Sequence, residues 1–520
     1  MLIPVTTLLL FLTALAIAIL QIVRPEFRFT WLTAVAGALL AWISVLLWQT
    51  NMPSSFNFLL WKPVSIFSES PSFATETISW PYALSLVTLA VSILLTASVN
   101  ETFTSAFAWA GSLTLCGLGL LAITAANPLT LALVWAALDL TELIITLRSV
   151  NDSASSERIV VSFSTRAAGI GLLIWANVVT SGSGKNLDFM TIPPQAGLYL
   201  LIASGLRLGV LPLHLPYSSE STLRRGFGTT LRLVSAASSL VILVYIPALS
   251  LAVPLTLLLL ILVTGAGIYG GWMWLRAPDE LIGRPFWIIG LASLSIAAAL
   301  LGNPVGTVAW GTALILIGGA LFLASVQQTW ISRALLIGAF SLSALPFSLT
   351  ASGWQGNIVG VWYILPFLLS AQALLMTGFI RSALRPSTRA SLASQPIWAR
   401  GIYPIGIGFL LLVQILLGLW GWQGALTIGK WAASIFASLL TLGLLWAIPR
   451  FPSLNPIPAH WVRPSITPWL DRLYENLRFI YNWLAGFCLT LSDILEGDSG
   501  IIWTLLFLVL FISLMTQRNP

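Results

Sequence analysis

The sequence predicts an all-α integral membrane protein with about sixteen transmembrane helices and no soluble domain of any size. Hydrophobic residues make up 58% of its 520 positions, charged residues only 8%, and the mean hydropathy is +0.93. Soluble domains carry roughly 25% charged residues. A chain this apolar cannot cover its own core with polar surface, so the lipid bilayer is its expected solvent.

Sixteen apolar stretches are long enough to be membrane spans. About twenty residues at a rise of 1.5 Å cross a hydrocarbon core of roughly 30 Å. The first stretch lacks a basic leader and a small-residue cleavage site, so we expect a span and not a signal peptide. The spans are expected at residues 5–23, 30–50, 81–99, 104–125, 128–147, 159–180, 196–215, 228–249, 254–275, 284–302, 306–326, 330–350, 357–380, 402–422, 430–448 and 500–516.

Basic residues alternate between the loops in a way that predicts orientation. Seventeen arginines fall in, or within four residues of, loops that follow odd-numbered spans, whereas the loops after even-numbered spans, with their edges, and the C-terminal tail hold four basic residues. Because positively charged loops stay in the cytoplasm, we expect the odd loops there and both termini on the non-cytoplasmic side. The expected location is a bacterial cell membrane or an equivalent energy-transducing membrane.

Few residues are suited to catalysis or to cofactor binding. The net charge of +7 comes from the loop arginines, so we expect the lipid bilayer and no nucleic acid as a partner. Cys116 and Cys488 lie far apart in apolar stretches, and the chain has two histidines. No CxxC pair, phosphate-binding glycine loop or metal-ligand spacing occurs. The sequence predicts no catalytic residue, no cofactor site and no metal site.

Two spans contain a glycine and a proline in a similar setting, around Pro212 in span 7 and Pro346 in span 12. Both helices are therefore expected to be broken. Because the two lie five spans apart, an odd number, the second set of helices would enter the membrane from the opposite side. Paired interrupted helices in inverted halves are typical of transporter cores. A proline frees backbone carbonyls, which is tolerable only beside a polar cavity or tightly packed protein.

The longest polar loop, residues 449–499, contains an amphipathic segment at about 468–487. Apolar residues recur there at helical spacing opposite charged ones. This predicts a helix that either lies on the cytoplasmic membrane surface or packs along its own bundle.

Four motifs, in order, resemble those of the antiporter-like membrane subunits of respiratory complex I, Mrp-type sodium/proton antiporters and membrane-bound hydrogenases. The resemblance covers about residues 100–360. The motifs are Asn127-Pro-Leu-Thr-Leu-Ala-Leu-Val-Trp135, Arg207-Leu-Gly-Val-Leu-Pro-Leu-His214, Leu275-Arg-Ala-Pro-Asp279 and Ile337-Gly-Ala-Phe-Ser-Leu-Ser-Ala-Leu-Pro346.

The resemblance implies a core of two inverted five-helix repeats that carries protons along a buried polar axis. It divides the chain into N-terminal helices (1–103), a first repeat of spans 4–8 (104–250), a second repeat of spans 9–13 (251–383) and C-terminal spans (384–520). Expected partners are other membrane subunits of a complex I-like or hydrogenase-like assembly. Within it the chain would be a non-redox subunit with no catalytic centre of its own.

The chain departs from the family at the residues that would carry protons. The family's span-5 glutamate is replaced by Ala136, and its span-7 lysine by Arg207. The positions of its span-11 and span-12 lysines fall at Gly319 and Trp354, and its polar end to span 8 meets serines from Ser235 onward. No lysine lies inside any span, apart from Lys430 at the first position of the span 430–448. The proton path is therefore expected to be degenerate.

The remaining charges inside spans each need a partner, because an ionisable residue at the bilayer centre costs roughly 2.5–3.5 kcal/mol. Asp139 and Glu142 lie one turn apart in span 5, and Arg207 is the expected counter-charge of one of them. His214 follows the broken helix and is either a relay or a structural histidine. Arg232 is either a displaced partner of Glu220 or a residue reaching the membrane surface, and we favour the second interpretation.

The candidate proton path or buried ion pair comprises Asp139, Glu142, Arg207, His214 and Arg232. Arg166 in span 6, in contrast, is expected to reach the membrane surface. Arginine stays charged in proteins, unlike a buried lysine. The sequence therefore favours a subunit of an NADH:quinone oxidoreductase-type proton-translocating complex with a degenerate path. The alternatives are a purely structural scaffold of such a complex and an independent secondary transporter for ions or inorganic carbon.

Overall fold

The computed structural model describes most of the chain in two compact units, Met1–Val462 and Arg463–Pro520. The described residues are 2–25, 27, 29–57, 70–99, 106–148, 153–182, 187–216, 225–246, 253–326, 328–355, 362–385, 392–419, 431–448 and 450, with four single residues in the second unit.

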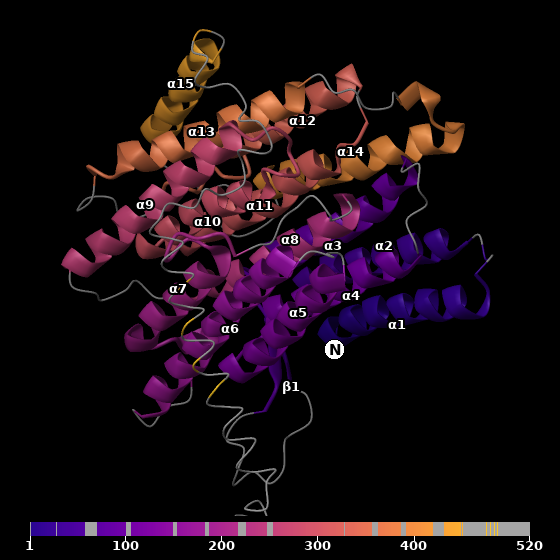
Figure 1. Ribbon diagram of the computed structural model, residues 1–520, viewed down its shortest axis with the longest axis horizontal. Coiled ribbons are helices and arrows are strands. Elements are labelled where there is room, and N and C mark those ends of the chain that lie inside the picture. The colour runs from indigo at the N-terminus through magenta and orange to yellow at the C-terminus, as the bar shows by residue number, and fades with distance from the viewer. Residues whose placement is uncertain are drawn as a thin grey trace, which may run out of the picture. The chain divides into compact units, whose positions relative to one another are not determined.

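Helices dominate the first unit, as the apolar stretches predict (Figure 1). Each of the first fifteen expected spans contains an α-helix. They are α1 (Leu2–Val23), α2 (Thr30–Trp48), α3 (Trp80–Thr96), α4 (Ala106–Thr124), α5 (Pro128–Arg148), α6 (Ser153–Ser181), α7 (Pro194–Leu208), α8 (Arg225–Leu240), α9 (Val253–Leu275), α10 (Arg284–Leu300), α11 (Pro304–Leu323), α12 (Thr329–Leu342), α13 (Leu365–Leu384), α14 (Ile397–Leu419) and α15 (Trp431–Ala447).

Eleven of the described helices are long and apolar enough to cross a membrane, so the chain is a multi-pass integral membrane protein. The expected count of sixteen is not confirmed. The sixteenth expected span, 500–516, lies outside the described residues, as does most of the expected amphipathic segment 468–487. Of that segment only Glu475, Phe479, Trp483 and Gly486 are described, and all four are helical.

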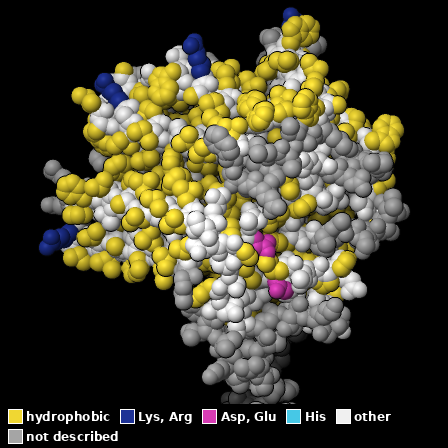
Figure 2. All heavy atoms as spheres, turned by 180° about the vertical axis from the view of Figure 1, so that it is seen from behind, with side chains coloured by type: hydrophobic (Ala, Val, Ile, Leu, Met, Phe, Trp, Pro, Cys, Tyr) yellow, Lys and Arg dark blue, Asp and Glu magenta, His cyan; other side chains and the backbone are white. Residues whose placement is uncertain are grey.

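The centre of the bundle is formed by α3, α8, α10 and α11, and α1 lies at its edge. In α8 and α11, 94% of the best membrane-spanning window is buried, against 33% in α1. The outer face of α1 exposes Leu8, Leu12 and Leu15 at helical spacing. Hydrophobic side chains cover much of the described surface on one face of the molecule (Figure 2). Such a surface is typical of contact with lipid or with other membrane proteins.

Helix α7 is broken near Pro212, as the sequence predicts. It ends at Leu208, and Gly209 takes a left-handed conformation with φ 76°. A Cβ at Gly209 would lie 2.4 Å from the carbonyl oxygen of His214, so only glycine fits there. The chain then turns through Pro212, whose peptide bond is cis, to His214.

Helix α12 is broken near Pro346, and neutral side chains satisfy the carbonyls that the break frees. It ends at Leu342, whose carbonyl accepts a 2.8 Å hydrogen bond from Gln372 Nε2 of α13. The carbonyl of Ala344 accepts a 2.7 Å bond from Ser434 of α15. The hydroxyl of Thr350 donates to the Ser341 carbonyl at 2.7 Å. Side chains of α13, of α15 and of the segment after α12 therefore satisfy the backbone carbonyls at this second break.

A short antiparallel hairpin, absent from the sequence-based expectation, covers the N-terminus of α5. Strand β1 (Ser54–Asn57) pairs with β2 (Ser72–Thr75). Asn127 caps α5 by accepting from Thr130 N at 2.9 Å, and its side-chain amide donates to the Ser70 carbonyl at 2.8 Å. With Pro128 at the first helical position, this capping sets where α5 begins and hence the depth of its carboxylates.

Candidate functional site

The candidate site is a cluster of buried charges around α5. Asp139 and Glu142 lie three residues apart on one face of this helix. Only 2% of Asp139 and 6% of Glu142 is exposed. An ionised carboxylate in such a place needs charged or hydrogen-bonding partners. Those partners come from α6, α7 and α8.

Arg207, in the last turn of α7, lies against Asp139. Its two terminal nitrogens donate to the two carboxylate oxygens at 2.6 and 2.9 Å, a bidentate arrangement. The guanidinium also lies over the ring of Trp135, with 4.2 Å from its carbon to the ring centroid. The break after Leu208 lets α7 end at this depth and so places Arg207 beside α5.

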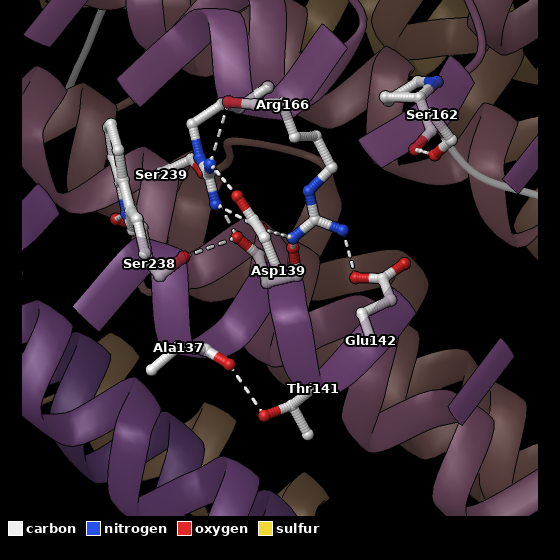
Figure 3. Close-up of polar contacts among 12 residues, drawn as sticks. Ala137, Asp139, Thr141, Glu142, Ser162, Arg166, Ser238 and Ser239 are labelled. Atoms are coloured by element: carbon white, nitrogen blue, oxygen red, sulfur yellow. Dashed lines mark hydrogen bonds and ion pairs between the residues drawn. The ribbon is translucent and has the colours of Figure 1, made fainter. Parts of the chain in front are cut away.

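Arg166 of α6 bridges both carboxylates, and the expectation that it reaches the membrane surface is wrong (Figure 3). Its Nη2 lies 2.6 Å from an oxygen of Asp139, and its Nη1 donates to Glu142. Helix α6 begins at Ser153, six residues before the expected start of the span. Arg166 is therefore about 20 Å along the helix from its N-terminus, and only 2% of it is exposed, so its guanidinium is enclosed by protein.

Arg232 of α8 completes the cluster. It is fully buried, and its Nη1 donates to the second oxygen of Glu142. The interpretation of Arg232 as a residue reaching the membrane surface is therefore also wrong. Glu142 thus accepts from Arg166 on one oxygen and from Arg232 on the other.

Serines of α8 line the cluster at the end of span 8, where the family has polar residues. The Ser235 hydroxyl accepts from Arg166, and the Ser239 hydroxyl accepts from Arg207 Nε at 3.1 Å. Trp135 Nε1 donates to the Ser238 carbonyl at 3.1 Å, which fixes the ring under Arg207. These serines contribute neutral acceptors and no titratable group.

Among the described residues, the arginines of the cluster outnumber its carboxylates by one. Three arginines face two carboxylates, and all five side chains are almost completely buried. Arginine does not lose its proton in proteins. The arrangement therefore stabilises fixed charges and lacks a base that can switch.

A small cavity lies between α5 and α6 beside the cluster. It is lined by both carboxylates and Arg166, and by Thr146 and Ser162. Its size suits about one water molecule. The Ser162 hydroxyl donates to the carbonyl of Pro216, which ties α6 to the segment after the broken helix.

The other sequence-predicted residues lie outside the ion-pair network. His214 is 5% exposed, and its Nδ1 lies 2.8 Å from the Pro212 carbonyl oxygen. Among the described residues it makes no ion pair with the cluster. In the second half, a Cβ at Gly319 would lie 2.8 Å from Leu89, and Trp354 Nε1 donates to Gln372 at 3.0 Å. These two positions are filled by tightly packed neutral groups.

Gly169 of α6 positions Arg207, a role that sequence reasoning missed. A Cβ at Gly169 would lie 2.6 Å from Arg207 Cγ and 3.1 Å from the Ala203 carbonyl oxygen. We expect Gly169→Ala to push the Arg207 side chain away from Asp139 and to lower the free energy of unfolding by about 1–3 kcal/mol. Unfolding in detergent measures this. Gly171→Ala is the matched control because nothing lies within 4 Å of its Cβ. Equal stability of the two variants would contradict this role.

No protein-family model and no curated protein sequence matches the chain. Chains of three solved membrane complexes are similar in structure. In an archaeal membrane-bound sulfane sulfur reductase the TM-score is 0.64 at 14% identity, over 99% of this chain and 100% of that one. In the Mrp complex from Dietzia sp. it is 0.70 at 12% identity, over 100% of this chain and 63% of that one. In respiratory complex I from Thermus thermophilus the TM-score is 0.59 at 17% identity, over 80% of this chain and 98% of that one.

The chain has the antiporter-like membrane subunit fold. The family predicted from four motifs is confirmed at the level of the fold. At identities of 12% to 17% the similarity shows the fold alone. This chain spans 63% of the length of the Mrp chain, so that longer chain has parts with no counterpart here. All three similar chains come from membrane complexes.

Proposed function

We propose that this chain is an antiporter-like membrane subunit of a redox-driven, proton-translocating complex of the NADH:quinone oxidoreductase type, and that its own proton path is degenerate. One observation carries the second part of the proposal. Both carboxylates of α5, Asp139 and Glu142, are held by arginines, which cannot take part in proton exchange. A relay needs a base that loses its proton near working pH.

The second half supports the same proposal. Between residues 285 and 380 the only Asp, Glu, Lys, Arg or His is Arg333. Asn303 Nδ2 donates to the Ser352 carbonyl at 3.0 Å, and Gln372 joins Trp354 to the Leu342 carbonyl. These amides satisfy the backbone of the second break without a titratable group. In this proposal the cluster and the break are structural parts that hold the helices together.

The structurally similar chains support the proposal that this chain belongs to a complex. The sulfane sulfur reductase is described as a respiratory membrane complex, and the third similar chain belongs to respiratory complex I. In this proposal the redox chemistry belongs to partner subunits. A chain without a working path then serves as a scaffold that joins neighbouring membrane subunits.

Co-purification tests the assignment. The tagged chain is extracted from its native membrane in mild detergent, and the proteins that remain bound after a high-salt wash are identified by mass spectrometry. We expect quinone-reductase or hydrogenase subunits in a fixed ratio. A chain that purifies alone, or with one small soluble partner, would contradict the assignment and favour an independent transporter for ions or inorganic carbon.

A further inference from the structure

Five arginines gather around the connection between α9 and α10, away from the buried cluster. Arg276 directly follows the end of α9, and Arg284 is the first residue of α10. Three more come from α8 and from the end of α13. We call this group the arginine corner; its arginines are Arg225, Arg276, Arg284, Arg381 and Arg385.

Arginines of the corner contact the ends of other helices. Arg381 Nη1 donates to the Leu275 carbonyl at 3.2 Å, and Arg385 Nη2 to the Ala277 carbonyl at 3.2 Å. Arg225 Nη1 donates to the Phe322 carbonyl at the end of α11 at 2.8 Å. Carbonyls at a helix C-terminus attract cations. The helix ends therefore account for part of the positive charge gathered here.

The described acidic residues of this connection are too few to balance the positive charge that the helix ends leave. Glu280 pairs with Arg225 at 2.9 Å, and Asp279 is the neighbouring acid. Two carboxylates leave a formal excess of three positive charges. The C-termini of α9, α11 and α13 contribute about half a negative charge each. An excess of about one to two positive charges remains. Arg381, in the last turn of α13, and Arg385, directly after the helix, are four residues apart, and their like charges repel.

The surroundings of this excess charge suit an amphipathic anion. Arg276 lies 5.5 Å from the ring centroid of Trp272, and its Nε has no hydrogen-bond partner among the described residues. Tryptophan and arginine together are typical of the level of lipid head groups. Leu384 lies between Arg381 and Arg385 in sequence, and 51% of it is exposed. A charged site next to exposed apolar surface fits a phosphate that carries acyl chains.

We propose that the arginine corner binds the phosphodiester head group of an anionic phospholipid. The phosphate oxygens accept from the guanidinium groups of Arg276, Arg381 and Arg385, three residues of intermediate exposure, since arginine and phosphate form strong charge-assisted hydrogen bonds. The acyl chains lie along α9 and α13. The lipid thereby neutralises the repulsion between the arginines and joins the ends of two helices of the second half.

Native mass spectrometry of the purified full-length chain tests this site. Phosphatidylglycerol or phosphatidylcholine is added to the protein in detergent, and the fraction of lipid-bound protein is measured. We expect the wild type to retain phosphatidylglycerol in preference to phosphatidylcholine. Arg276→Gln is expected to weaken that retention about fivefold, because one arginine near the head groups is worth about 1 kcal/mol. Arg276→Lys should keep most of it.

Arg450→Gln is the matched control, since Arg450 also lies over a tryptophan, 3.7 Å from the ring centroid of Trp446, but at the end of α15. This variant should retain phosphatidylglycerol as the wild type does. The proposal is overturned if the wild type shows no preference between the two lipids, or if Arg276→Gln retains phosphatidylglycerol unchanged. It is also overturned if inorganic phosphate displaces the lipid at millimolar concentration, because a free anion would then be the ligand.

Discussion

Replacing Asp139 by asparagine is expected to destabilise the protein by about 3–5 kcal/mol, the usual cost of removing one partner from a buried ion pair. The cluster has three arginines and two carboxylates. The variant leaves one carboxylate for three arginines among the described residues, so the cluster loses half of its negative charge. The side chain of asparagine has almost the same volume as that of aspartate, and no cavity contributes to the loss.

Unfolding of the variants in detergent measures this effect. Arg207→Gln is the informative comparison, because it leaves two arginines for two carboxylates and should cost less than Asp139→Asn. The double variant, with Asp139→Asn and Arg207→Gln together, should lose less free energy of unfolding than the two single losses add up to. We expect a difference of at least about 1 kcal/mol, because contacting residues are coupled. Additive losses, or a larger loss for Arg207→Gln, would contradict the charge count.

Gly270→Ala is expected to have the second largest effect, with a loss of about 1–3 kcal/mol or more. A Cβ at Gly270 would lie 2.7 Å from the backbone nitrogen of Gly290 and 3.0 Å from the Phe286 carbonyl oxygen. Both contacts are backbone atoms of α10, so no side chain can move aside. Small residues at such a crossing allow two membrane helices to approach closely.

The control for Gly270→Ala lies on the same helix. Gly265 of α9 has nothing within 4 Å of its Cβ, so Gly265→Ala should be neutral or slightly stabilising. Thermal unfolding of both variants in one detergent gives the comparison. If Gly270→Ala unfolds at the same temperature as Gly265→Ala, the packing of α9 on α10 is not as close as described here.

The sequence predicts the helices well because hydrophobic length alone sets them. The first fifteen expected spans all contain helices, and both breaks lie beside the prolines that predicted them. The hairpin of Ser54–Asn57 and Ser72–Thr75 escaped prediction because its strands have four residues each and pair with each other and with the end of α4, which no local pattern reveals.

The charge cluster could be predicted only in part. The cost of burial directed attention to Asp139 and Arg207, which the structure places in contact. Arg166 was misplaced because the polar first turns of α6 look like a loop, so the helix was expected to begin too late. Arg232 was misread because its partner, Glu142, lies on another helix 90 residues earlier. Contacts between helices depend on tertiary packing, which hydropathy does not encode.

Proton flux tests the central proposal, a degenerate path, most directly. The purified chain is reconstituted in liposomes that contain a pH-sensitive dye, and an imposed potential drives protons across the membrane. Wild type and Asp139→Asn are compared at equal amounts of folded protein. The account predicts that neither exceeds protein-free liposomes, because arginines hold both carboxylates. A wild-type flux that Asp139→Asn abolishes would show that the cluster conducts protons, and would contradict the account.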